Sequence, residues 1–105
     1  MTMSEKERKN MLANLEQEET DLMTMSATIV IMHHGINAMK DLQQYQGMLG
    51  GARHAFERQI ELAESKLKTV NAVRRELGID LLPYDLEEAT QVLSRDFMNN
   101  VDKPI

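Results

Sequence analysis

A heptad repeat runs through the first part of the chain and constrains the fold more than any other feature. When positions a and d are counted from Arg8 onward, every one of them from Leu22 to Met39 is apolar. A repeat of this kind is typical of helices that pack side by side. The sequence therefore predicts an all-α fold, built on a long antiparallel, coiled-coil-like helical hairpin with a short C-terminal helix.

Capping residues and glycines indicate where the helices begin and end. Ser4 and Glu7 form a capping box at the start of the first helix. Gly78 stands where a helix C-cap is expected, and Asp85 is a suitable N-cap for the last helix. The expected boundaries are helix one at about residues 4–46, a turn at 47–51, helix two at about 52–77, a connector at 78–84, helix three at about 85–98 and a tail at 99–105, all within a single helical domain 1–105.

The turn is predicted from glycine alone. Gly47, Gly50 and Gly51 crowd into five residues, and each glycine weakens a helix by about 1 kcal/mol relative to alanine. Glycine also suits the left-handed residue that ends many helices. The alternative, a single helix that continues through this stretch, stays open.

The middle of helix one carries no charged residue between Leu22 and Met39. A hairpin buries one stripe of each helix, so the opposite side is expected to be charged. Val30 and Ile31 occupy positions b and c, opposite the a/d seam, so apolar side chains surround nearly a whole turn. This pattern indicates a helix that packs on several sides. The candidate oligomer or partner interface comprises Leu22, Met25, Ile29, Val30, Ile31, Met32, Ile36 and Met39.

Two explanations for this apolar girdle are open. Helix two and helix three of the same chain could cover it, or a second copy or another protein could pack there. Three helices in a chain of 105 residues bury a modest core, and the pairing of two hairpins into a bundle is a common remedy. We therefore expect a homo-oligomer, most simply a dimer formed by helical-bundle packing.

The composition argues against several other classes of protein. The chain has no cysteine, which removes disulfides, thiol nucleophiles and cysteine-based zinc sites. Its net charge of −5 is unsuited to a nucleic-acid binder, which needs a positive surface. His33, His34 and His54 lack the spacing of metal-ligand pairs. We expect no catalytic residue, no cofactor and no metal.

A membrane location is also not expected. The uncharged stretch of helix one contains polar side chains such as His33, His34 and Asn37, which are costly in lipid. The first residues lack the apolar core of a signal peptide. The sequence therefore favours a cytoplasmic protein.

These features favour a non-enzymatic helical protein–protein interaction module, such as an adaptor, inhibitor or regulator, whose partners are a second copy of itself and an unidentified protein. A small structural or assembly component, of the kind that phages encode, also fits the pattern. The long–medium–short order of the helices resembles, in outline, that of dimeric all-helical chorismate mutases. That resemblance implies several Arg or Lys side chains, from helix one and its neighbours, around a dianionic substrate. The chain departs from it, because no Arg or Lys lies between Lys9 and Lys40.

Overall fold

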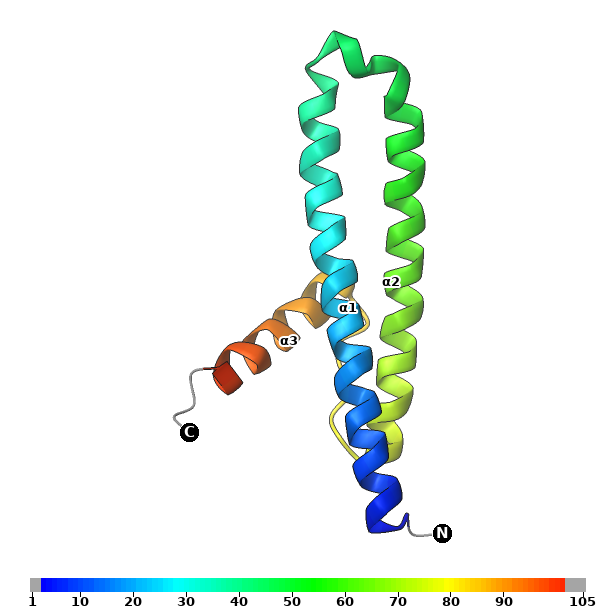
Figure 1. Cartoon of the computed structure of the whole chain (residues 1–105), viewed down its shortest axis with the longest axis vertical. Helices are drawn as coiled ribbons and strands as arrows, with labels where there is room; N and C mark the ends of the chain where they lie inside the picture. Colours follow the sequence, from blue (N-terminus) through cyan, green and yellow to red (C-terminus); the bar gives the residue numbers. More distant parts are fainter. Residues whose placement is uncertain (1–2, 102–105) are drawn as a thin grey trace.

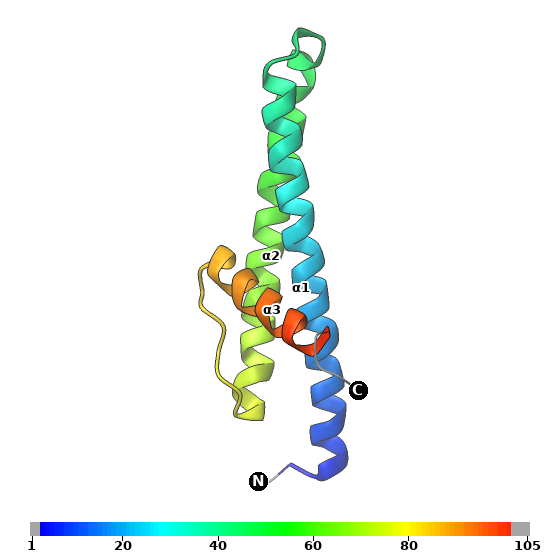
Figure 2. The ribbon, with the colours of Figure 1, turned by 90° about the vertical axis from the view of Figure 1, so that its left-hand side faces the viewer.

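The computed structural model describes residues 3–101 and consists of helices joined by short connections (Figure 1). Two long helices run antiparallel as a hairpin, and a shorter helix crosses one face of it (Figure 2). The predicted all-α fold, a helical hairpin followed by a short C-terminal helix, is confirmed. The elements are α1 (Glu5–Lys40), the 3-10 helix η1 (Gln43–Met48), α2 (Leu49–Leu77) and α3 (Leu86–Val101).

Local capping sets three of the helix ends where the sequence predicts them. The Ser4 hydroxyl accepts a hydrogen bond of 3.1 Å from the backbone N–H of Glu7 at the start of α1. Gly78 has a φ of 71° and ends α2 in the left-handed conformation that glycine adopts without strain. The Asp85 carboxylate accepts a hydrogen bond of 3.0 Å from the N–H of Glu88 and so caps α3.

The turn between α1 and α2 differs from the prediction. Helix α1 ends at Lys40 rather than at residue 46, and α2 begins at Leu49 rather than at residue 52. The reason is a side-chain cap: Gln46 Nε2 donates a hydrogen bond of 2.9 Å to the backbone carbonyl of Lys40. This bond satisfies a carbonyl that the end of a helix leaves without a partner. Gly50 and Gly51 lie inside the first turn of α2, and among the described residues only Gly78 has a positive φ.

The end of α3 also differs. Asn99 and Asn100, which are expected to end the helix, are part of it, because α3 continues to Val101. Asparagine costs a helix less than about 1 kcal/mol, so two asparagines do not stop a helix that is otherwise favourable. The part of the predicted tail that follows Val101 lies outside the described residues.

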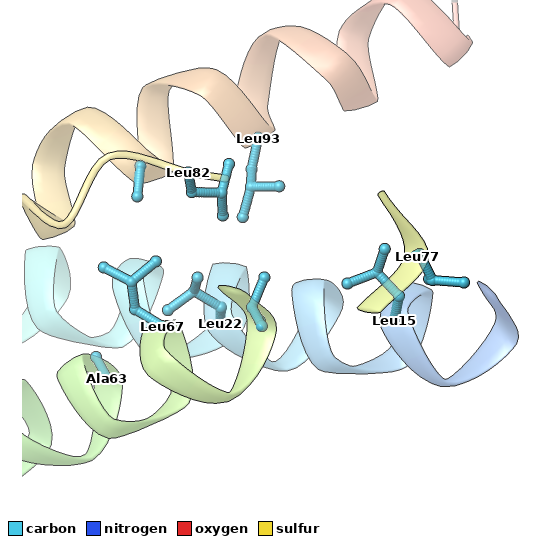
Figure 3. Packing of buried hydrophobic residues seen from close by; sticks show 9 residues of the cluster. Leu15, Leu22, Ala63, Leu67, Leu77, Leu82 and Leu93 are labelled. Carbon is cyan, nitrogen blue, oxygen red and sulfur yellow. The ribbon is translucent and has the colours of Figure 1, made fainter. Parts of the chain in front are cut away.

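The hydrophobic core lies in the half of the hairpin that α3 crosses (Figure 3). Leucines from α1, α2, the connector and α3 meet there, and each contributes about 1.5–3 kcal/mol by its burial. The connector takes part because Leu82 is almost fully buried, while its neighbour Leu81 stays exposed. The buried apolar residues are Leu15, Leu22, Ala63, Leu67, Val70, Leu77, Leu82, Ala89 and Leu93.

Two buried polar side chains on α2 attach the connector to the hairpin. Asn71 donates a hydrogen bond of 3.0 Å to the carbonyl of Leu82 and accepts one of 2.8 Å from the N–H of the same residue. Arg74 donates to the carbonyl of Asp80 at 2.6 Å and pairs with Glu19 of α1 at 3.2 Å. Burial raises the pKa of the Glu19 carboxyl above its ordinary value, although the neighbouring Arg74 acts in the opposite direction.

Candidate protein interface

The half of the hairpin beyond α3 has no complete core. We call residues 27–62 the distal arm; it contains the end of α1, η1 and the start of α2. None of its residues is fully buried, whereas the rest of the hairpin supplies most of the core. In Figures 1 and 2 the distal arm extends past α3 as a bare pair of helices. An isolated pair of helices buries one stripe of each and leaves the remaining apolar surface in water.

The structure places the eight predicted interface residues in three different environments. Leu22 has no exposed surface and belongs to the chain's own core, so it is not available to a partner. Val30 and Ile31 are 55% and 70% exposed, which means that α2 and α3 do not cover the apolar girdle. The explanation in which the chain buries this region by itself is therefore wrong. The other five residues are half-buried: Met25, Ile29, Met32, Ile36 and Met39.

A groove opens where the distal arm meets the start of α3. It has a volume of about 790 Å³ and lies between α1, α2 and the first turn of α3. Its apolar lining comes from Ile29 and Val30 on α1, from Phe56 and Ile60 on α2 and from Leu86 on α3. Large apolar side chains around an open concave surface are typical of sites that receive an apolar segment of a ligand or a partner.

The charged side chains that line the groove are all acidic. They are Glu64 from α2 and Asp85 and Glu87 around the start of α3, and no Arg or Lys is among the lining residues. Recognition of a dianionic substrate of the chorismate type relies on Arg or Lys side chains, and neither is among the residues that line this groove. The groove therefore does not support the outline resemblance to chorismate mutases.

Two histidines form the edge of the groove on α1. The His33 ring lies 5.9 Å from the Phe56 ring, centroid to centroid, and its Nε2 is 3.2 Å from Nδ2 of Asn37. The His34 ring is 6.0 Å from that of His33. Both histidines are exposed, and within residues 3–101 no three His, Cys, Asp or Glu side chains are placed to hold a metal ion.

Sequence reasoning identified the α1 side of the groove but not its other walls. Phe56 and Ile60 lie on the apolar stripe of α2, at the same helical spacing as the core residues Ala63 and Leu67. They line the open groove instead. Helix α3 crosses the other half of the hairpin and leaves the first part of α2 uncovered (Figure 2). The crossing position of α3 depends on tertiary contacts of the connector, and no local sequence signal encodes it.

No helix within the described residues has the length and apolar character needed to cross a membrane. No protein-family model matches this chain, and no curated protein or solved structure is detectably similar to it.

Proposed function

We propose that this chain is a non-enzymatic helical interaction module that acts in the cytoplasm as a homo-oligomer, most simply a dimer, and presents its groove to a second protein. The observation that carries the proposal is the distal arm, in which Val30 and Ile31 remain exposed on a helix without a nearby charge. Exposed apolar patches of this kind mark interaction surfaces in soluble proteins.

The distal arm buries little of its apolar surface within one chain. The arm leaves Val30 and Ile31 of α1 exposed, and none of its residues is fully buried. A single hairpin cannot enclose these side chains, because each of its two helices packs only one face against the other and leaves the remaining faces in solvent. Pairing of two hairpins into a four-helix arrangement removes this surface from water, at roughly 25 cal/mol for each Å² of apolar area.

The solution mass tests the self-association. Static light scattering on the purified chain, at concentrations from about 5 to 200 μM to bracket a micromolar dissociation constant, is expected to give a mass that approaches twice 12.0 kDa. A mass that stays at 12.0 kDa over the whole range contradicts the homo-oligomer. Circular dichroism at the same concentrations checks that the chain is helical in each sample.

The enzymatic alternative has a direct test as well. Chorismate turnover to prephenate, measured by loss of chorismate absorbance, is expected to equal the uncatalysed rate, because carboxylates are the charged groups that line the groove. Saturable turnover by the purified chain overturns the non-enzymatic part of the proposal and leaves the solution mass unaffected.

A further inference from the structure

A second heptad seam runs along the outside of α1. Its residues follow one another at alternating spacings of four and three, all of them exposed and none of them charged. We call this row the outer seam. It is made of Ala13, Gln17, Thr20, Thr24, Ala27, Ile31, His34 and Ala38.

The outer seam lies on the third side of α1. Since successive residues of a helix turn by about 100°, the outer seam is roughly 150° around the helix from the a/d seam that faces α2, and about 130° from the residues that face α3. One of the residues that face α3 is Ser26, whose hydroxyl is 2.9 Å from that of Thr90. Two sides of α1 are therefore packed within the chain, and among the described residues nothing packs on the side that carries Ile31.

The outer surface of α2 provides an internal comparison. The outer side of α2 is also exposed, and charged residues recur along it between uncharged ones such as Leu62 and Ser65; the charged residues are Arg58, Glu61, Lys68 and Glu76. Arg58 and Glu61 form an exposed ion pair of 3.8 Å. Charged residues are the ordinary choice for a solvated helix face. The outer seam of α1 breaks that rule over its whole length.

We infer that the outer seam pairs with the same seam of a second copy, α1 against α1, in antiparallel orientation. The inference rests on the self-association proposed above and specifies its surface and geometry. The seam spans about 38 Å at 1.5 Å per residue, and its nearly four heptads reach the length that sustains a two-stranded helical contact. Its alanines and threonines allow the two backbones to approach to about 8 Å.

The flanking charges select the antiparallel orientation. Residues on the two edges of a helical seam also contact the partner helix. In a parallel pair, an edge residue meets the residue five positions later in the second copy, so Glu16 of each copy lies opposite Asp21 of the other. This arrangement places like charges together twice. In the antiparallel pair centred between Met25 and Ser26, Met23 is a diagonal neighbour of Val30 of the second copy on the same edge of the seam, and the exposed Val30 gains an apolar contact.

The same antiparallel register matches large residues with small ones inside the seam. Thr24 lies opposite Ala27 of the second copy, and Ile31 lies opposite Thr20. At the two ends, Ala13 of each copy meets Ala38 of the other. The seam is therefore complementary to itself, which is the requirement for a two-fold symmetric contact.

Cysteine cross-linking tests the geometry, since the chain has no cysteine of its own. Ala13→Cys and Ala38→Cys are made as separate proteins; both positions are exposed and small, so neither substitution disturbs the core. After mixing and mild oxidation, the expected product is a disulfide between the two different variants, and each variant alone stays uncross-linked. The reason is that a disulfide requires Cα atoms within about 7 Å.

A charge substitution tests the surface. Ile31→Glu is expected to weaken dimerisation by about 100-fold, because it places a carboxylate in the centre of the contact. Leu62→Glu on α2 is the matched control, as Leu62 is also an exposed apolar residue, and it leaves the dimer mass unchanged. Circular dichroism establishes that both variants keep their helices.

The outcomes separate the inference from the proposed function. Three results overturn the antiparallel outer-seam contact while the proposed self-association stands. The dimer persists with Ile31→Glu, each cysteine variant cross-links to itself, or the mixture gives no cross-link. A wild-type chain that remains at 12.0 kDa overturns both.

Discussion

At the scale of single residues, the fold depends on polar groups that have every hydrogen bond they need. Asn71 is 1% exposed and satisfies both the N–H and the carbonyl of Leu82, which lies eleven positions further along the chain. These two bonds hold the connector against α2 and so place the start of α3. Among the side chains of residues 3–98, no buried nitrogen or oxygen lacks a hydrogen-bond partner.

Replacement of Asn71 by alanine is expected to lower the free energy of unfolding by about 2–4 kcal/mol, because it leaves two buried backbone groups without partners. Urea denaturation followed by circular dichroism measures the change. Asn10→Ala, at an exposed position of α1, is the control and is expected to change the free energy by less than about 0.5 kcal/mol. Equal effects of the two substitutions contradict the role given to Asn71.

At the scale of elements, the helix ends show what the sequence does and does not encode. The caps at Ser4, Gly78 and Asp85 are local, because each involves atoms within five residues of the cap, and all three were predicted. The turn was predicted too late in the chain, because a side chain, Gln46, replaces glycine as the device that ends α1. Glycine spacing alone does not reveal such a cap.

Two glycine substitutions test whether Gly78 is the left-handed C-cap of α2 and Gly51 is part of its helical start. Gly78→Ala is expected to destabilise the protein by about 1–2 kcal/mol, because alanine is strained at a φ of 71°. Gly51→Ala is expected to stabilise it by about 0.5–1 kcal/mol, since Gly51 is helical and an added Cβ meets nothing within 4 Å. Thermal unfolding of both variants provides the comparison. If Gly51→Ala destabilises the protein as much as Gly78→Ala does, the left-handed turn predicted from the glycines is correct and the helical start of α2 is not.

At the scale of the whole molecule, the chain divides into a proximal half with a core and a distal arm without one. The heptad pattern predicted the hairpin and identified Val30 and Ile31 as excess apolar surface, and both residues are exposed. The pattern did not predict that Leu22 is buried in the chain's own core or that Phe56 lines a groove. Both outcomes depend on where α3 crosses the hairpin, which is fixed by contacts between segments far apart in the sequence.

The central claim is that the distal arm is completed by contact between molecules. Amide hydrogen exchange, measured at about 5 and 200 μM protein, tests it directly, because exchange reports the local opening of each segment. The account predicts that protection of residues 27–39 rises with concentration, while protection around Leu67 and Leu93 stays the same at both concentrations. The account is contradicted if residues 27–39 are already as protected as the proximal core at the lower concentration and their protection does not change at the higher one.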